Sequence, residues 1–474
     1  MLIEDVDNMS LVTTLLEQCG IQATLAQGDD FQKWLINEAW NKYKDNRMNK
    51  RIVIENQVKD LNIKLSNGTV RKDYTACFSL PKDVVTDFWL DGYDQLGLKC
   101  DVSEENECTI SGKPTQPGDF KLKLSYKYDG MIDGEEPLSI ELPIAFNPDP
   151  RSLWKDIPTD KNVIFYKDDC ACEYVKVVEK EETGPRKDIV AASQRGRSHA
   201  QEGKARDDHF KLVHCDDSDW YIIAVADGAG SAKYSRKGSE IACETVVSHC
   251  LEKLKDSTSF EEKIRAYKNA ENEEAARKQM GNVIYDIIGN AAFKAHKAIN
   301  DASKANVDSK PKDFATTLMF AICKKFDFGW FIASYWVGDG AMCLYNEKKG
   351  TSKLLGIPDE GEYSGQTRFL TMPEIFKDAT AVFGRLRFSI EEDFTSLMLM
   401  TDGVSDPMIE TENNLNDFEK WKEFWNKLKT GFPEDEIGGV DLSDDNEESK
   451  TQLLNWLSFW SPGNHDDRTI AILY

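Results

Sequence analysis

Aspartates follow directly after apolar stretches at several separate places in this sequence. The stretches read "AVADGAG", "YWVGDG", "LMTDGVSD" and "NHDDRTIAIL", and an acidic pair, Asp207 and Asp208, precedes "HFKLVHC". A single Asp-Gly pair has an ordinary explanation, because both residue types favour tight turns. Carboxylates gathered at one rim, however, repel one another unless a positive charge lies among them. The repeated pattern therefore indicates a cation site.

The residue types also indicate which cation the site would bind. Hard divalent cations prefer oxygen ligands, whereas zinc sites are typically built from histidine and cysteine. The sequence contains no His-x-His and no Cys-x-x-Cys pattern, so we expect Mg²⁺ or Mn²⁺. Gly228, directly after Asp227, has no side chain, which lets its backbone carbonyl approach a metal.

Strands and two long helices must position these aspartates. The apolar runs "WYIIAVAD", "TTLMFAIC", "WFIASYWVGD", "SLMLMTDG" and "RTIAILY" predict strands. Apolar residues recur at helical spacing in "GSEIACETVVSHCLEKL" and "NVIYDIIGNAAFKAHKAIN". Strands that frame two such helices predict a layered domain with helices packed on sheets, from about residue 187 to 474.

The first 186 residues divide into three zones. Residues 1–50 carry apolar residues at helical spacing and predict a helical segment. Residues 51–148 alternate apolar and polar positions, with an Asn67-Gly68 turn signal, and predict an all-β domain. Residues 149–186 are rich in proline and charge, which is typical of a linker.

Composition excludes some classes of partner. Acidic residues outnumber basic ones by 83 to 59, and the resulting net charge of −24 disfavours nucleic-acid binding. The start, "MLIEDVDNMS", lacks the basic and apolar regions of a secretion signal. No apolar run has the length of a membrane span. The eleven scattered cysteines favour reduced thiols, so we expect a cytoplasmic protein.

Seven short motifs occur in one order from about residue 190 to the end. They are "GRSH", "RDDHF", "VADGAGS", "ATTLMFA", "VGDGAMCLY", "LMTDGVSD" and "DDRTIAIL". In this order they resemble the metal-dependent serine/threonine protein phosphatases of type 2C. The resemblance implies an α+β fold with four layers, α-β-β-α, and two metals, with a third in some members. It also implies hydrolysis of phosphoserine and phosphothreonine in a phosphoprotein by a metal-activated water, without a protein nucleophile.

The resemblance assigns roles by position. Asp227 would bridge both metals, and Asp402 and Asp466 would bind the first. Asp208, with Asp207 beside it, would lie near the second metal, and Asp339 would help to hold a third. The implied metal ligands are thus Asp208, Asp227, Gly228, Asp339, Asp402 and Asp466.

The sequence departs from the family pattern where the substrate phosphate would bind. The family usually carries an arginine close before the acidic pair, but here His199 is nearest to that position. Arg197 and Arg206 are alternative phosphate-binding residues, and a structural role for His199 stays open. The catalytic residues would be Asp208, Asp227 and His199. Asp467 replaces an asparagine that often follows the last metal ligand, and we expect Asp467→Asn to be mild.

Three further expectations concern segments outside these motifs. Residues 108–130, "CTISGKPTQPGDFKLKLSYKYDG", resemble immunoglobulin-like or cadherin-like sandwich repeats, which implies that residues 1–150 bind a protein partner. Residues 360–388 lie where the family that the sequence resembles often has a mobile flap that selects substrates. Residues 433–452 are acidic and poor in aromatic residues, which predicts a solvated, partly disordered loop.

Two other functions stay open at this point. A pseudophosphatase would keep the fold as a binding module without turnover, although the complete set of aspartates favours an enzyme. A hydrolase of small phosphate esters would use the same metals, because a metal centre does not distinguish what the phosphate is attached to.

Overall fold

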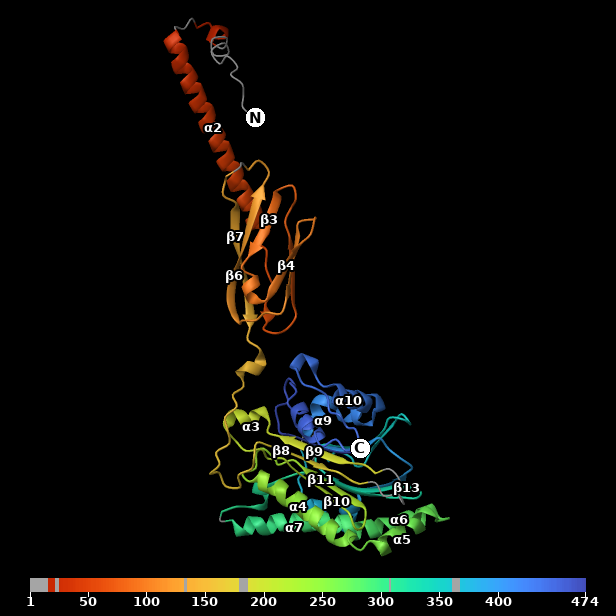
Figure 1. The fold of residues 1–474 in the computed structure, drawn as a ribbon. Helices are drawn as coiled ribbons and strands as arrows, with labels where there is room; N and C mark the ends of the chain where they lie inside the picture. The colour runs from red at the N-terminus through yellow and green to blue at the C-terminus, as the bar shows by residue number, and fades with distance from the viewer. Residues whose placement is uncertain (1–15, 22–24, 132–133, 179–185, 307, 360–366) are drawn as a thin grey trace. The chain divides into compact units, whose positions relative to one another are not determined.

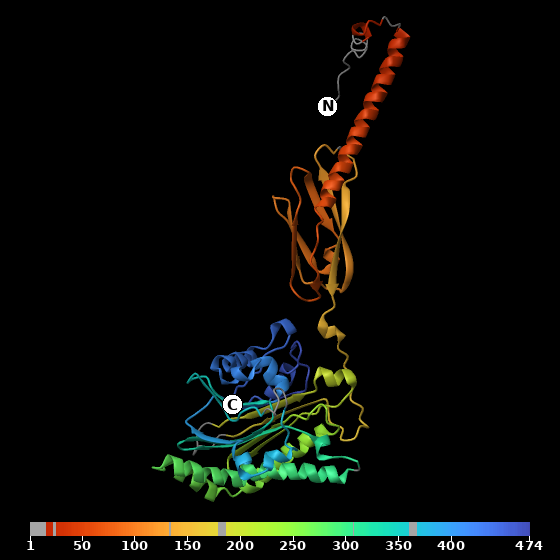
Figure 2. The same ribbon diagram turned by 180° about the vertical axis from the view of Figure 1, so that it is seen from behind.

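A computed structural model describes residues 16–21, 25–131, 134–178, 186–306, 308–359 and 367–474. The chain forms two compact units, Met1–Leu153 and Trp154–Tyr474, and each is described by itself (Figures 1 and 2). In the described residues, no helix is both long enough and apolar enough to cross a membrane.

The first unit begins with one long helix, α2 (Leu25–Asp60). The prediction that helical structure ends near residue 50 and gives way to strands is wrong. Ile54 and Val58, one helical turn apart, are buried in the core of the following β-domain, and Arg51 Nη1 donates to Glu135 Oε1 at 2.9 Å. These tertiary contacts extend the helix through the β-branched run that indicated a strand.

Seven described strands of the first unit form a two-sheet sandwich. One sheet has the order β1 (Gly68–Thr69), β7 (Leu138–Asn147), β6 (Gly118–Tyr128) and β3 (Val85–Asp91), and the other β2 (Tyr74–Ser79), β5 (Glu107–Gly112) and β4 (Leu98–Val102). In β6, Leu122, Leu124 and Tyr126 are buried while the lysines between and beside them are exposed. The alternation agrees with the predicted strands from Gly68 onward, whereas residues 51–60 belong to α2. The immunoglobulin-like class stays a prediction.

The second unit contains two antiparallel sheets packed face to face. The first has the order β10 (His209–Cys215), β11 (Trp220–Ala226), β12 (Leu318–Phe326), β13 (Gly329–Val337) and β16 (Leu386–Glu391). The second has the order β15 (Thr351–Leu354), β14 (Ala341–Asn346), β17 (Ser396–Met400), β18 (Arg468–Leu473), β9 (Ile189–Gln194) and β8 (Cys170–Val175).

Helices cover the outer faces of both sheets. The five-stranded sheet packs against α4 (Ser235–Leu254) and α7 (Asn290–Ala305), with α5 (Thr258–Lys268) and α6 (Glu273–Ile284) in the same layer (Figure 1). The six-stranded sheet packs against α9 (Asp402–Ile409), α10 (Phe418–Thr430) and α11 (Ser449–Trp456). Two shorter helices are α3 (Arg197–Glu202) and α8 (Ala379–Phe383). This arrangement agrees with the four layers expected from the sequence.

Strand β11 shows why the layers form. Trp220, Ile222 and Ala224 point into the core beneath α4, whereas Tyr221 and Ile223 point into the core between the two sheets. Because successive side chains leave a strand on opposite faces, a strand buried on both faces reads as a continuous apolar run. The run ends where the chain reaches the rim of the sheets, at Asp227.

The interpretation of residues 149–186 as a linker is wrong. Cys170–Val175 is strand β8, which pairs with β9 over its whole length, and the compact unit begins at Trp154. Arg195, in turn, donates to Asp156 at 2.6 Å and to the Thr159 hydroxyl at 2.7 Å. The charged residues that indicated a linker thus have partners far away in the sequence.

Two loop expectations also change. In residues 433–452, expected to be partly disordered, Val440 is buried and its N–H donates to the Leu428 carbonyl at 2.8 Å. Of the expected flap, residues 360–366 lie outside the described residues. Its later part is packed, because Ile375 and Val382 are buried in the core beneath the first sheet's helices.

The strand pairing of β8 leads to a first prediction. A fragment of residues 187–474 lacks β8 and leaves buried Arg195 without its carboxylate partners Asp156 and Asp169. Loss of this edge strand exposes the paired backbone and the buried side chains of β9 to water, so this fragment should unfold roughly 5 °C or more below a fragment of residues 154–474. Scanning calorimetry of both fragments measures the difference. Equal unfolding temperatures would restore the linker interpretation.

Candidate metal centre

Three aspartates meet at one end of the second unit. One carboxylate oxygen from each of Asp227, Asp339 and Asp402 lies within 4.8 Å of the others. Asp227 follows β11, Asp339 follows β13, and Asp402 follows β17 as the first residue of α9. Oδ1 of Asp339 and Oδ1 of Asp402 are buried without a hydrogen-bond partner among the described residues. Buried carboxylate oxygens without donors are suited to a cation.

Asp227 is held by its backbone, which leaves its carboxylate available. Its N–H donates to Thr317 Oγ1 at 2.8 Å, and its carbonyl accepts from Thr316 Oγ1 at 2.7 Å and from the Thr317 N–H at 2.8 Å. Gly228 pairs with Thr316 as a β-bridge, and a Cβ there would come within 2.6 Å of the Asp207 carbonyl oxygen. The two threonines of "ATTLMFA" therefore position Asp227 at the end of β11, a role that sequence reasoning missed.

Asp208 lies behind this cluster, fully buried. Its Oδ2 accepts from Thr469 Oγ1 at 2.6 Å and from Thr401 Oγ1 at 3.0 Å. Burial, followed by the negative charge of Asp467, raises the pKa of Asp208 to about 7. Its carboxyl group is thus fixed by hydroxyl donors, and no ion pair to it is found among the described residues.

The carboxyl groups of the cluster perturb one another. Burial and then the charges of Asp402 and Asp208 raise the pKa of Asp227 well above its ordinary range. Burial and then the charges of Asp339 and Asp466 do the same to the pKa of Asp402. Without a cation, these groups keep protons that they would lose in water. Divalent cations would relieve this repulsion and release the protons, so the residues present fit hard metal ions.

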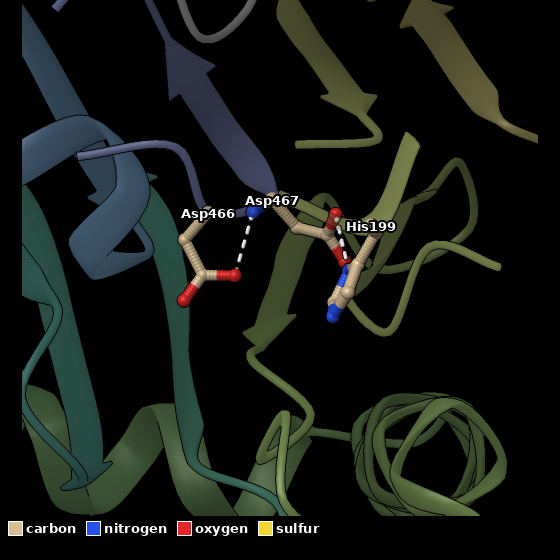
Figure 3. A group of neighbouring side chains, drawn as sticks. All are labelled: His199, Asp466 and Asp467. Carbon is tan, nitrogen blue, oxygen red and sulfur yellow. Dashed lines mark hydrogen bonds and ion pairs between the residues drawn. The ribbon is translucent and has the colours of Figure 1, made fainter. Parts of the chain in front are cut away.

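Asp466 and Asp467 are neighbours with opposite roles. Figure 3 shows the Asp467 carboxylate turned toward His199 and the Asp466 carboxylate turned to the other side, where it accepts the Asp467 N–H at 2.8 Å. Asp467 accepts from the N–H groups of Gly196 and Asp207, at 2.6 and 2.5 Å, and approaches His199 Nδ1 at 3.0 Å. Burial opposes ionisation, but the hydrogen bonds from His199 and the two N–H groups outweigh it and lower the pKa of Asp467.

His199 is a fixed positive charge beside the acidic pair. Burial disfavours its protonation, but the hydrogen bond and charge of Asp467 and the charge of Asp207 raise its pKa to about 9. Its Nε2 lies 3.6 Å from Asp207 Oδ2. The imidazole is therefore protonated near neutral pH and is oriented through Nδ1.

Part of the second unit matches a known protein family. Residues 195–458, more than half of the chain, match the family model described as protein phosphatase 2C. The chain belongs to the protein phosphatase 2C family. Asp466 and Asp467 lie beyond the matched residues, so their places rest on the structure described above.

Solved structures of distant phosphatases are similar to part of the chain. A serine-threonine phosphatase 2C from Toxoplasma gondii is 11% identical, covers 64% of this chain and 98% of its own, and has a TM-score of 0.37. A bacterial serine phosphatase is 12% identical, with 60% and 96% covered and a TM-score of 0.35. The catalytic domain of the phosphatase PstP, solved with two manganese ions, is 14% identical, with 64% and 98% covered and a TM-score of 0.34. No curated protein matches the chain.

The two arginines predicted to bind phosphate have other partners in this protein phosphatase 2C domain. Arg197 donates to the carbonyls of Ser458 at 2.8 Å and Phe459 at 3.2 Å. Arg206 is buried, and its Nε donates to the Asp168 carbonyl at 3.2 Å. His199, the third candidate named from the sequence, contacts Asp207 and Asp467 through its side chain.

Two basic residues that the sequence did not single out lie close to the acidic pair. Arg236 Nη1 is 3.7 Å from Asp207 Oδ1, and its Nε donates to the Phe165 carbonyl at 3.0 Å. Lys167 Nζ donates to the Asp208 carbonyl at 3.0 Å, and burial followed by the charge of Arg206 lowers the pKa of Lys167 to about 7. Neither belongs to a motif or a spacing pattern, so only the fold reveals them.

The contacts of Asp467 reverse the expectation that Asp467→Asn is mild. An asparagine has one acceptor oxygen, so its NH₂ group must face the N–H of Gly196 or of Asp207. We expect a lower unfolding temperature and a fall of at least about one unit in the pKa of His199, which loses its ionised partner. Titration of the histidine NMR signals measures the pKa. Asp466→Asn is the matched control with a smaller change, and an unaltered His199 pKa in Asp467→Asn would contradict the assignment.

The raised carboxyl pKa values predict how stability depends on pH. Burial, as the largest cause, raises the pKa of Asp207 and of Asp406 to about 6, and that of Asp208 to about 7. A group whose pKa is higher when folded favours the folded state at low pH and loses that contribution as pH rises through the folded pKa. In chelator, the free energy of unfolding should therefore fall between about pH 4 and pH 7.

Magnesium should remove this pH dependence, because the cation replaces the protons. Denaturant titrations with chelator and with Mg²⁺, at pH 5 and at pH 7.5, measure the effect. Stabilisation by Mg²⁺ should be larger at pH 7.5 and should shrink in Asp227→Asn. Equal stabilisation at both pH values would show that cation binding is not coupled to these carboxyl groups.

Proposed function

We propose that the second unit is a phosphoprotein phosphatase that hydrolyses phosphoserine and phosphothreonine with two or three Mg²⁺ or Mn²⁺ ions. The observation that carries this proposal is the convergence of Asp227, Asp339 and Asp402 within 4.8 Å. Two of these groups have a buried oxygen without a donor among the described residues. Membership of the protein phosphatase 2C family supports the part of this proposal that makes the domain a metal-dependent protein phosphatase.

The residues divide into ligands and groups that hold the ligands. Asp227, Asp402 and Asp466 would bind one cation, and Asp227, Asp208 and the Gly228 carbonyl would face a second, with Asp339 toward a third. When bound, such cations activate a water molecule and offset the charge of the phosphate. The chain itself fixes the ligands: threonine hydroxyls hold Asp208, and backbone hydrogen bonds hold Asp227.

His199 is the residue we assign to the substrate phosphate. Asp467 holds the Nδ1 side of the ring, and a pKa of about 9 keeps the ring positively charged at neutral pH. A fixed positive charge that needs no reorganisation stabilises negative charge that develops during phosphoryl transfer. His199 would thus take the part that an arginine plays elsewhere in the family.

Two alternative functions of the second unit are a pseudophosphatase and a hydrolase of small phosphate esters. The carboxylate set favours an enzyme over a pseudophosphatase, and the choice between proteins and small phosphate esters depends on groups outside the metal centre.

We propose that the first unit, an immunoglobulin-like sandwich with α2, binds a protein partner. A cytoplasmic location stays a prediction from composition.

The central test is metal-dependent turnover. The protein should release phosphate from phosphoserine and phosphothreonine peptides when Mg²⁺ or Mn²⁺ is supplied, and chelation should abolish release because all proposed ligands are oxygens. Asp227→Asn should lower kcat by at least about 1,000-fold, since several ions would share this carboxylate. The same variant should unfold in chelator at the wild-type temperature or higher, because one repelling charge is gone.

A small aryl phosphate measured beside the peptides separates the alternatives. Faster turnover of the ester than of every peptide, as kcat/KM, would favour the small-ester hydrolase. Metal binding without turnover of either substrate would favour the pseudophosphatase. Full turnover in excess chelator would remove the metal-dependent mechanism.

A further inference from the structure

Residues 154–169, which we term the strap, contact the metal centre from outside the part of the chain that matches the family, residues 195–458. The centroid of the Trp154 ring lies 4.3 Å from the centroid of the His465 ring, and His465 directly precedes Asp466 in the sequence. The Ile157 N–H donates to the carbonyl of Ala200 at 2.9 Å, and Ala200 directly follows His199 in the sequence. The strap therefore reaches two of the segments that carry the proposed site.

The innermost contact of the strap is made by Lys167. This half-buried side chain directs its ammonium group inward, where Nζ donates to the Asp208 carbonyl at 3.0 Å and to Ser239 Oγ at 3.2 Å. Ser239, on α4, is fully buried, and its hydroxyl donates to the Asp207 carbonyl. One lysine and one serine thus bind the backbone carbonyls of both residues of the acidic pair.

These backbone groups need such partners because the sheet does not supply them. The ladder between β10 and β11 starts with His209 opposite Ala226, so Asp207 and Asp208 precede its first pair. A buried carbonyl without a donor is costly, and a ligand whose backbone can shift loses its metal geometry. The Asp208 carboxylate is held by Thr401 and Thr469 at one end, and its main chain is held by Lys167 at the other.

We propose that Lys167 is a positioning residue that fixes the backbone of Asp207 and Asp208, and through it the Asp208 carboxylate, for divalent cations. The inference rests on the proposed function, because it concerns the same cation site. It assigns part of the metal centre to a segment that the family motifs do not include. Lys167 acts by donating hydrogen bonds, so a methionine of similar length removes the action while filling the space.

The experiment compares Lys167→Met with Lys187→Met in the full chain. Lys187 is a matched control, because it is also half-buried and also donates to a backbone carbonyl, that of Thr395 at 3.5 Å. Neither Lys187 nor Thr395 belongs to the proposed metal centre. Calorimetric titration of the metal-free proteins with Mn²⁺ gives the affinity, and kinetics with one phosphopeptide give kcat and KM.

Lys167→Met should weaken Mn²⁺ binding by about 10- to 100-fold, as loss of a group that orients a metal ligand does. Its kcat should fall at saturating Mn²⁺ while KM for the peptide changes by less than about twofold, because the proposed role of Lys167 is to hold the backbone and not to bind the substrate. Lys187→Met should lower the unfolding temperature and keep the wild-type Mn²⁺ affinity. A merely structural Lys167 would behave like Lys187.

Ser239→Ala provides a second and gentler variant if Lys167→Met fails to fold. It removes the hydroxyl between Lys167 and the Asp207 carbonyl, so Mn²⁺ binding should weaken by several-fold. If the wild-type protein binds Mn²⁺ and either folded variant binds it equally well, the positioning role of Lys167 is wrong and the proposed function stands. If the wild-type protein binds no Mn²⁺, both fall.

Discussion

Repulsion among buried carboxylates is the constraint on which the second unit depends. Asp227, Asp339 and Asp402 could separate if the chain around them were flexible, and the pKa values of Asp227 and Asp402 would then return toward normal. Each instead follows a strand of a packed sheet, and the backbone of Asp227 is fixed by donating to Thr317 Oγ1 and accepting from Thr316 Oγ1. The two sheets thus hold carboxylates at a distance that suits a cation between them.

The structure treats two consecutive aspartates in opposite ways. Asp467 receives donors from Gly196, Asp207 and His199, so it is a saturated, ionised anchor. Asp466 accepts one backbone N–H and is turned away, so its remaining acceptor capacity is free for a ligand. Charge alone therefore does not identify a metal-binding aspartate. The number of donors that already satisfy it does.

Local patterns predicted the strands and the aspartates at their ends, because burial on both faces and a turn after the strand leave a mark in adjacent residues. β11 followed by Asp227 is the clearest case. Patterns failed where the deciding partner is distant. The sequence around Ile54 predicts a strand, but Ile54 is part of helix α2 and is buried in the core of the sandwich. The positioning threonines and the partners of Asp467 likewise lie in distant segments of the chain, where no spacing rule points to them.

The boundary of the second unit follows from its sheets rather than from its motifs. In the six-stranded sheet, β18 lies between β17 and β9, and β8 pairs with β9 at the edge. All three lie outside residues 195–458, which match the family. A fragment limited to the matched residues would lose the middle of one sheet, and with it the strand that follows Asp466. Because β8, β9 and β18 complete the sheet beside the proposed metal centre, we expect the centre to form in the whole unit from Trp154 to Tyr474 and not in the matched residues alone.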